Sequence, residues 1–182
     1  MMQVTGGGPL VIGVGNPYRR DDGIGHTVAK RLRSSASVRL AVVEASGEGA
    51  ALMDLFEASP WVMLIDAISS GASPGTVVRV DAVQETLPHR LFRFSSHAFG
   101  VGQAVELARA LGRLPQRLTI FGVEGADFTE GLGLSPEVAQ VVEQVVGFVL
   151  AEASGIATAT YTDRVLEHTV LDVGGNQVRE DT

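Results

Sequence analysis

The sequence predicts a single α/β domain built as a three-layer αβα sandwich. Its five-stranded twisted sheet is expected to be mostly parallel, with one antiparallel strand. Short apolar runs of strand length alternate with segments whose apolar residues recur at helical spacing. One run, 61–67, is almost wholly apolar, as expected of a strand covered on both faces. The 182 residues, 45% hydrophobic and 19% charged, are enough for one core.

In the first half of the chain, each strand is followed by a helix. The first strand ends where Gly-Asn-Pro begins, because proline cannot continue a central strand. In the helix that follows, Ile24, Val28 and Leu32 recur at i, i+4 and i+8, and Asp22 suits its N-terminal end. The expected elements are strand 10–14, helix 22–32, strand 38–45, helix 50–58 and strand 61–67.

The second half adds two strands and two helices. A short turn-rich connection, 71–75, leads to the fourth strand, which we therefore expect to run antiparallel to the third. The last helix begins at the N-cap Ser135 with proline at its first helical position. The expected elements are strand 76–80, helix 100–111, strand 117–124 and a helix from 135 to about 153.

The domain is expected to span residues 1–154. Residues 155–182 break the alternating pattern and are treated as a C-terminal extension. An added hairpin, a partner-binding arm and a loose tail remain open for it.

Composition excludes several classes of protein. With no cysteine, the chain has no thiolate metal site, disulfide or cysteine nucleophile, which fits a cytoplasmic protein. The net charge is −7 and no stripe of Lys and Arg stands out, so nucleic acid is not an expected partner. No apolar run approaches the ~20 residues that span a bilayer, so no membrane segment is expected. Residues 1–8 lack the pattern of a signal peptide.

Three polar residues are expected to meet at one edge of the sheet. Asp22 follows the first strand, Asp66 closes the third apolar run, and His97 precedes the third helix. In parallel sheets, binding groups gather beyond the carboxyl ends of the strands. Two carboxylates and one imidazole can hold a divalent transition metal and leave room for water or a substrate atom. The sequence therefore predicts that the chain holds or recognises a metal.

Other readings of the chain are weaker. The glycine loop after the first strand lacks the third glycine of a dinucleotide fingerprint, where Tyr18 stands, and its carboxylates would repel a pyrophosphate. Glu124 is a second candidate at the same edge, and His26 is expected to be exposed. The sequence has no Gly-x-Ser-x-Gly elbow, no His-Glu-x-x-His helix and no duplicated Asp-Thr-Gly signal.

Four motifs together resemble the [NiFe]-hydrogenase maturation endopeptidases. They occur in the family's order over residues 9 to 153. They are Gly13-Val-Gly-Asn-Pro-Tyr-Arg-Arg-Asp-Asp-Gly-Ile-Gly25, Leu64-Ile-Asp-Ala-Ile68, Ser96-His97 before a helix, and Phe121-Gly-Val-Glu124 followed by Gly131-Leu-Gly-Leu-Ser-Pro-Glu-Val138. The chain departs from the family at Gly125, where a proline is frequent, and at Ala98-Phe99, where a polar residue or glycine often follows the histidine.

The resemblance implies an aspartyl-type endopeptidase activity. Family members remove a short C-terminal extension from the hydrogenase large-subunit precursor after nickel insertion. The family's metal-contacting and catalytic positions fall on Asp22, Asp66 and His97. The nickel is carried by the substrate, with cadmium or zinc as surrogates, and no organic cofactor is implied.

Two alternatives remain open. One is a non-catalytic metal- or nucleotide-binding module of similar fold. The other is a different peptidase of the same architecture, such as a relative of the spore-protein proteases. Titration with nickel, cadmium, NAD or ATP separates the first, and cleavage of a large-subunit precursor separates the second.

Overall fold

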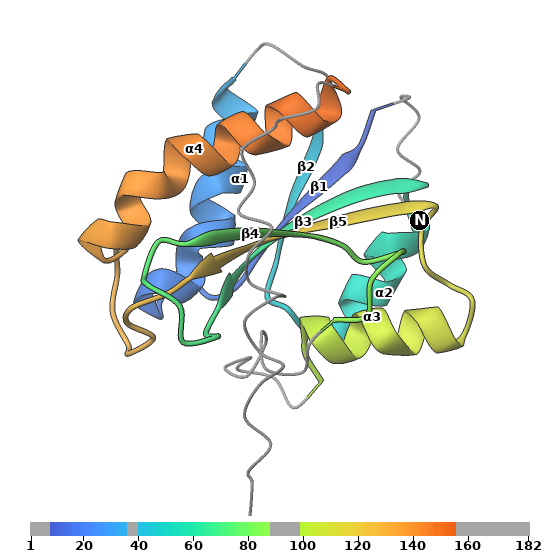
Figure 1. Ribbon diagram of the computed structural model, residues 1–182, viewed down its shortest axis with the longest axis horizontal. Helices are drawn as coiled ribbons and strands as arrows, with labels where there is room; N and C mark the ends of the chain where they lie inside the picture. Colours follow the sequence, from blue (N-terminus) through green and yellow to red (C-terminus); the bar gives the residue numbers. More distant parts are fainter. Residues whose placement is uncertain (1–7, 36–39, 88–98, 156–182) are drawn as a thin grey trace, which may run out of the picture.

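The computed structural model describes residues 8–35, 40–87 and 99–155, in which one sheet lies between two layers of helices (Figure 1). The predicted order of strands and helices is confirmed. His97 and almost all of the C-terminal extension lie outside the described residues. In chain order the elements are β1 (Leu10–Val14), η1 (Arg20–Gly23), α1 (Ile24–Ser34), β2 (Ala41–Ala45), α2 (Gly49–Glu57), β3 (Trp61–Ile68), β4 (Val77–Asp81), α3 (Val101–Ala110), β5 (Arg117–Glu124) and α4 (Pro136–Ala153).

The sheet has the order β2-β1-β3-β5-β4. All neighbouring strands are parallel except β4, which pairs antiparallel with β5. The predicted direction of the fourth strand is therefore right, but β5 lies between it and β3. Seven of the eight residues of β5 are buried, which suits a central strand. In β4, Arg79 and Asp81 are half-buried, which suits an edge.

The helices cover both faces of the sheet (Figure 1). Helices α2 and α3 share one apolar core with the sheet, and α1 and α4 share the other. Because side chains alternate along a strand, β3 contributes to both cores. Val62, Leu64 and Ile68 face α2 and α3, whereas Met63, Ile65 and Ala67 face α1 and α4. Each fully buried large apolar side chain contributes roughly 1.5–3 kcal/mol.

The first helix begins differently from the prediction. A 3₁₀ turn, Arg20–Gly23, precedes α1, so Asp22 lies in this turn and is not the N-cap of the helix. The turn brings the start of α1 directly against the sheet. A Cβ atom on Gly25 would lie 2.2 Å from the Val14 carbonyl oxygen and 2.5 Å from that of Ile65. Only glycine allows this approach.

Substituting Gly25 tests this packing. We expect Gly25→Ala to lower the free energy of unfolding by about 3 kcal/mol, because the backbone of α1 must move away from β1 and β3. Gly147→Ala is the matched control, since Gly147 lies in α4 with no atom within 4 Å of the added Cβ. That change should leave stability equal or slightly higher. Equal denaturation midpoints for the two variants would contradict the close contact at Gly25.

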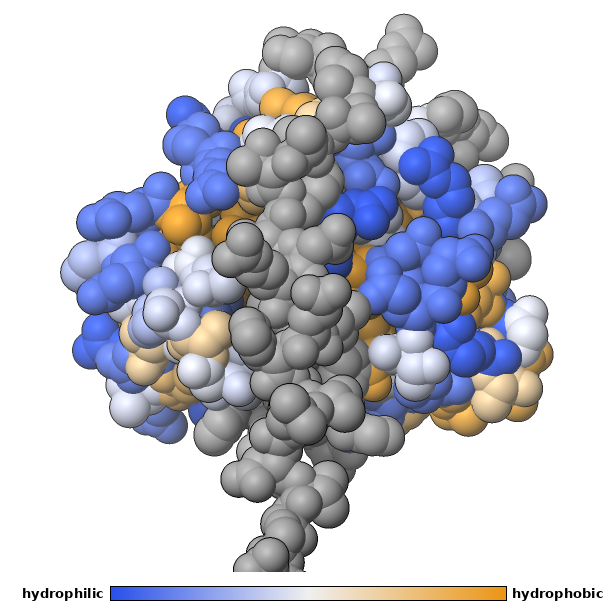
Figure 2. All heavy atoms as spheres, in the orientation of Figure 1, coloured by the Kyte–Doolittle hydropathy of each residue, from blue (hydrophilic) through white to orange (hydrophobic). Residues whose placement is uncertain are grey.

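The surface is mixed in character. No helix in residues 8–35, 40–87 and 99–155 is long and apolar enough to cross a membrane. Hydrophilic residues cover much of the face in Figure 2, and hydrophobic residues gather at the corner over α3. Leu107 on α3 and its C-cap Leu111 are exposed.

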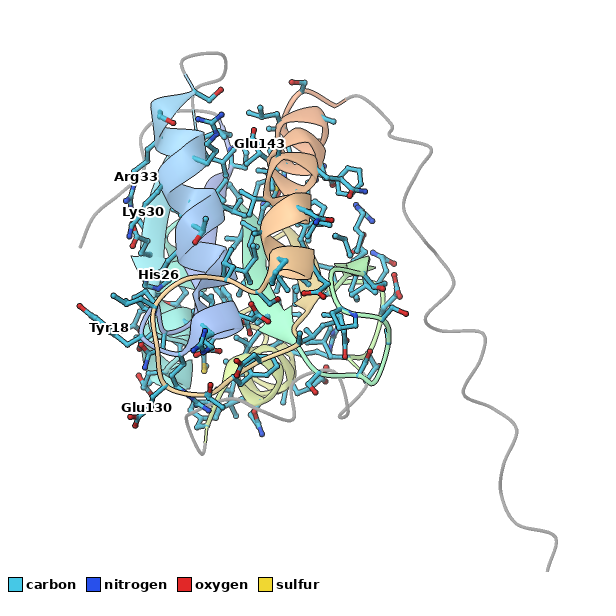
Figure 3. The ribbon with its side chains drawn as sticks, turned by 90° about the vertical axis from the view of Figure 1, so that its left-hand side faces the viewer. Tyr18, His26, Lys30, Arg33, Glu130 and Glu143 are labelled. Carbon is cyan, nitrogen blue, oxygen red and sulfur yellow. The ribbon has the colours of Figure 1, made fainter. Side chains whose placement is uncertain are left out.

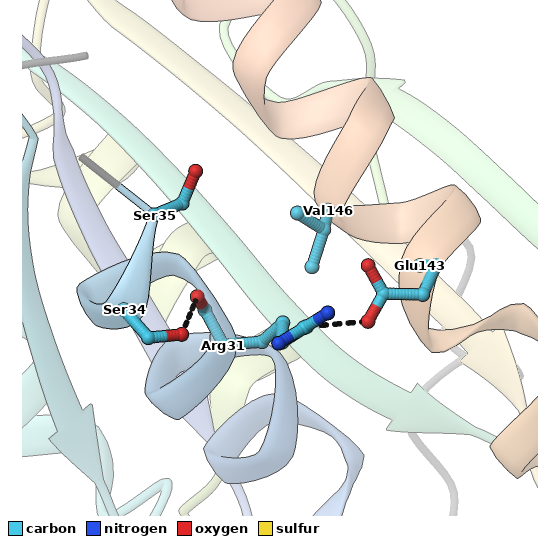
Figure 4. Close-up of a pocket in the computed structure, with 5 residues that line it drawn as sticks. All are labelled: Arg31, Ser34, Ser35, Glu143 and Val146. Carbon is cyan, nitrogen blue, oxygen red and sulfur yellow. Dashed lines mark hydrogen bonds and ion pairs between the residues drawn. The ribbon is translucent and has the colours of Figure 1, made fainter. Parts of the chain in front are cut away.

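A hollow of about 270 Å³ lies between α1 and α4 (Figure 4). Arg31, paired with Glu143, lines it together with Ser34, Ser35 and Val146. It lies at the C-terminal end of α1. The turn that carries Asp22 precedes the other end of this helix.

Candidate functional site

Two buried aspartates meet at the carboxyl edge of the sheet. Asp22 comes from the turn after β1, and Asp66 is the sixth residue of β3. Their residues are 7% and 8% exposed. The charge of Asp22 acts on the carboxyl group of Asp66 strongly enough to raise its pKa. Asp22 therefore lies close enough to Asp66 for the two carboxyl groups to interact.

Asp66 lies just beyond the point where β3 stops pairing with β1. Pairing between these strands ends at Gly13 and Ile65, one residue before Asp66. By strand alternation, Asp66 projects to the same face as Leu64 and Ile68, which is the face under α2 and α3. Its Oδ1 atom accepts a hydrogen bond of 2.9 Å from the Ala67 backbone N–H.

The environment of Asp66 disfavours its charged form. Burial is the largest cause of the raised pKa, the charge of Asp22 is the second, and the hydrogen bond from Ala67 opposes both. The pKa of Asp66 therefore stands well above the ordinary value of 3.8. Two carboxyl groups in this state can share a proton or bind a cation. This chemistry fits a metal-recognition site.

Asp22 is held by the loop that follows β1. Its Oδ2 atom accepts a hydrogen bond of 3.0 Å from the Asn16 backbone N–H. The loop turns back at Gly15, whose φ is +126° and whose Cβ would lie 1.8 Å from the Asp22 carbonyl oxygen. The glycine loop therefore aims Asp22 toward the sheet edge.

Asp21, unlike Asp22, binds a distant segment of the chain. Its carboxylate is fully buried and accepts hydrogen bonds from the backbone N–H groups of Ala126, Asp127 and Ser135, at 2.8, 2.9 and 2.7 Å. The Ser135 hydroxyl donates a fourth, at 2.9 Å. Asp21 thus ties the turn to the loop before α4, and its charge lies at the positive end of that helix.

Two arginines strengthen the same connection. The Arg19 guanidinium donates to the Phe128 carbonyl oxygen at 3.1 and 3.3 Å. Arg20 donates to the Thr129 hydroxyl at 3.2 Å and pairs with Asp127 at 3.1 Å. These bonds join segments more than 100 residues apart, so no local pattern in the sequence could have revealed them.

Glu124, the second candidate, is engaged in holding the chain. Its buried carboxylate accepts hydrogen bonds from the Ser70 N–H and hydroxyl and from the Gly71 N–H, at 2.7 to 3.0 Å. Glu124, and not Asp66, therefore makes the bonds to Ser70 in this turn. This leaves Asp66 free of the turn after β3.

Two other sequence expectations are settled by the geometry. His26 is not fully exposed; its ring nitrogens lie 3.0 Å from Glu44 and 3.1 Å from the Ala45 carbonyl oxygen. Glu44 lies near the end of β2, where a dinucleotide-binding fold places an acid for the ribose, but it already pairs with His26 and Arg33. The nucleotide-binding alternative gains no support from this arrangement.

His97 lies outside the described residues, but the start of α3 shows where the following chain lies. Phe99 accepts a hydrogen bond of 2.9 Å at its carbonyl oxygen from the Gly49 N–H, and its ring covers Gly49. Gly49 is the first residue of α2, beyond the carboxyl end of β2. In contrast, β4 ends at Asp81 opposite Thr119, at the edge where the parallel strands begin. The end of β4 therefore gives no reason to expect His97 at the carboxyl edge. Phe99, two residues further along the chain, lies against Gly49 at that edge and does give one.

Comparison with known proteins decides the family. The model of the family described as HycI, hydrogenase maturation protease, matches residues 24–152. The chain belongs to the hydrogenase maturation protease family. This membership makes it a relative of peptidases that act in hydrogenase maturation, and the fold agrees.

Individual relatives support the assignment. The hydrogenase expression/formation protein HupD of Rhodobacter capsulatus is 29% identical over 79% of this chain and 68% of its own length. The hydrogenase 2 maturation protease of Escherichia coli is 26% identical over 78% of this chain and 88% of its own length. The structure of the [NiFe] hydrogenase maturation protease HybD from Thermococcus kodakarensis is 26% identical and superposes with a TM-score of 0.64 over 80% of this chain and 98% of that protein.

One departure from the maturation protease pattern has a structural reason here. Gly125 donates its backbone N–H to the Ile68 carbonyl oxygen at 3.0 Å, a bond that a proline could not make. A Cβ at this position would also lie 2.5 Å from the Phe128 ring. Glycine therefore fits this chain, because the loop that Asp21 holds packs against it.

Proposed function

We propose that this chain is an endopeptidase that removes the C-terminal extension of a [NiFe]-hydrogenase large-subunit precursor after nickel insertion. Asp22, Asp66 and His97 recognise the nickel that the precursor carries. The observation that carries the proposal is the buried pair of carboxyl groups at the sheet edge, one of which has a strongly raised pKa.

The acid pair explains why a metal-loaded substrate would be preferred. Asp66 is disfavoured as an anion by burial and by the charge of Asp22. A divalent cation brought by the precursor relieves both effects, since it compensates the two charges and displaces a proton. The family's nickel dependence thereby gains a physical basis in this chain.

A third ligand is needed to complete the site. Among the described residues, no three His, Asp or Glu side chains cluster as a metal site requires. Asp66 projects toward the face that carries α3, and this helix begins at Val101, four residues after His97. The anchored Phe99 is two residues from His97, and two residues span at most about 7 Å. These facts support His97 as the third group.

The reaction then follows from positioning. Contact between the substrate nickel and the three side chains fixes the scissile peptide bond near the acid pair. A water molecule attacks its carbonyl carbon, and a carboxylate accepts the proton that the water loses. The amine of the released extension takes up a proton as the bond breaks. The chain's own contribution is orientation and proton transfer.

Incubation with a large-subunit precursor tests the proposal. We expect mass spectrometry to show loss of the C-terminal extension from the nickel-loaded precursor and no change in the metal-free precursor. Intact mass after prolonged incubation of the nickel-loaded form with the wild-type protein would refute the function.

Replacing His97 tests its assigned role. We expect His97→Ala to lower the rate of processing by at least about 100-fold, because one of the three contacts to nickel is lost. His89→Ala is the matched control, since the sequence gives His89 no partner acids, and it should process at the wild-type rate. Normal processing by His97→Ala would remove His97 from the site.

A further inference from the structure

Two exposed apolar side chains lie on neighbouring loops that adjoin the turn carrying Asp22. Tyr18 is 68% exposed and Leu132 is 73% exposed. Their loops are joined directly, because the Gly131 N–H donates to the Tyr18 carbonyl oxygen at 2.8 Å and the Arg20 N–H donates to the Gly131 carbonyl oxygen at 3.1 Å. Figure 3 shows Tyr18 pointing outward below α1, at the same corner as Glu130.

These loops are held firmly although their tips are exposed. Asp21 accepts four hydrogen bonds across them, and Arg19 and Arg20 add further bonds. A loop whose backbone is fixed before binding loses little conformational freedom when a partner covers it. Exposed aromatic side chains in this condition are typical anchors of protein interfaces.

Tyr18 is also connected to the acid pair. Its backbone N–H donates to Asn16 Oδ1 at 2.9 Å, and the Asn16 N–H donates to Asp22 at 3.0 Å. A protein that brings a metal ion to Asp22 must therefore cover or closely approach the segment that carries Tyr18. An isolated metal ion would have no contact with Leu132.

An open hollow of about 500 Å³ borders Tyr18. Pro17, Tyr18 and Ala45 form apolar parts of its wall, and His26 and Glu44 line it as well. The two ionisable groups are already paired with each other, and Glu44 also with Arg33. A ligand here therefore gains more from apolar contact than from a charge. The hollow suits an apolar side chain.

We propose that Tyr18, Leu132 and this hollow form a docking surface for apolar side chains of the polypeptide that surrounds the nickel in the precursor. The inference rests on the proposed function and extends it to a second region of contact. We call these residues and the hollow they border the Tyr18 surface. Glu130, exposed beside Leu132, adds negative charge that favours a basic residue at the margin of the partner.

The test compares single substitutions in the full-length protein. We expect Tyr18→Ala and Leu132→Ala each to raise KM for the nickel-loaded precursor about tenfold, with kcat within about twofold of the wild type, because uniform binding is lost. Tyr18→Phe should retain the wild-type KM, since the ring and not the hydroxyl makes the contact. Leu111→Ala is the control, because this exposed leucine is the C-cap of α3, away from both loops.

Binding is measured beside cleavage so that the two proposals fail separately. Biolayer interferometry with the immobilised precursor should show weaker binding by Tyr18→Ala, and melting temperatures should be unchanged. If the wild type cleaves and the variants keep its KM and affinity, the Tyr18 surface is wrong. If the wild type does not cleave but Tyr18→Ala still weakens binding, the surface stands and the proposed reaction fails.

Self-association is the remaining outcome to separate. Sedimentation velocity of the isolated wild type and of Tyr18→Ala should give the same mass. A wild-type dimer that Tyr18→Ala dissociates would show that the surface binds a second copy of this chain, and would overturn the proposal. Absence of precursor binding by the wild type would overturn it as well.

Discussion

Asp66→Asn should abolish processing of the nickel-loaded precursor and at the same time stabilise the isolated protein above pH 4. Activity is lost because the neutral amide of asparagine neither balances the charge of a divalent cation nor accepts a proton from water. We expect a rate reduced by at least about 10³-fold, as for removal of a reacting group. The gain in stability has a separate cause, which the pKa of Asp66 explains.

The sign of the stability effect follows from the raised pKa. The folded protein holds a proton on Asp66 at pH values where the unfolded chain has lost it, so unfolding releases a proton. Stability conferred by the protonated form is complete below the ordinary pKa of 3.8. It is lost as pH rises toward the raised pKa, at up to about 1.4 kcal/mol per pH unit. Asparagine stays neutral and avoids this loss.

The difference between the two proteins should therefore grow with pH. Urea unfolding at a series of pH values should give similar free energies for the wild type and Asp66→Asn near pH 4, and a widening advantage for the variant above it. Asp127→Asn is the control, because hydrogen bonds from Thr129 lower the pKa of half-buried Asp127. That variant should show no such gain. A variant that is less stable than the wild type at every pH would contradict the buried, charge-disfavouring environment of Asp66.

The adjacent aspartates should respond in opposite ways to the same substitution. We expect Asp21→Asn to lower the free energy of unfolding by about 3–5 kcal/mol, because four donors converge on its two oxygens and an amide nitrogen cannot accept from them. Asp22→Asn should change stability by less than about 1 kcal/mol, since its oxygen can still accept from Asn16.

The two substitutions should affect activity in the opposite order, with the larger loss from Asp22→Asn. Asp22→Asn should abolish processing while the protein stays folded, whereas Asp21→Asn, assayed below its lowered melting temperature, should retain part of it. Chemical denaturation and precursor processing, measured on the same preparations, check both expectations. Equal losses of stability in the two variants would show that the division between a structural Asp21 and a metal-facing Asp22 is wrong.

Much of the fold could be predicted because its signals are local. The alternation of apolar strands with helical spacing gave the element order, and the apolar run before Asp66 identified a buried strand. Because parallel strands share a carboxyl edge, Asp22 and Asp66 could be expected to lie close together. The placement of β5 between β3 and β4 was missed, because a short connection between consecutive strands suggests direct pairing, and only the burial of β5 on both faces shows otherwise.

The site could be predicted only in part, because several of its contacts join segments that are far apart in the sequence. The bonds from Asp21, Arg19 and Arg20 to the loop before α4 depend on tertiary contact between distant segments. The sequence suggested Asp22 for the N-terminal end of the first helix, whereas Gly23 is the N-cap of α1 and it is Asp21 that accepts from Ser135 at the N-terminus of α4. The role of His97 remains a prediction from its position before α3.

The most direct test of the account is the coordination of nickel in the precursor before and after this chain binds. Nickel X-ray absorption can be recorded on the nickel-loaded precursor alone, with the wild type mixed and frozen before cleavage, and with Asp66→Asn. The account predicts additional oxygen or nitrogen ligands on nickel with the wild type and fewer with Asp66→Asn. Identical nickel spectra in all three samples, under conditions where the wild type cleaves, would contradict it.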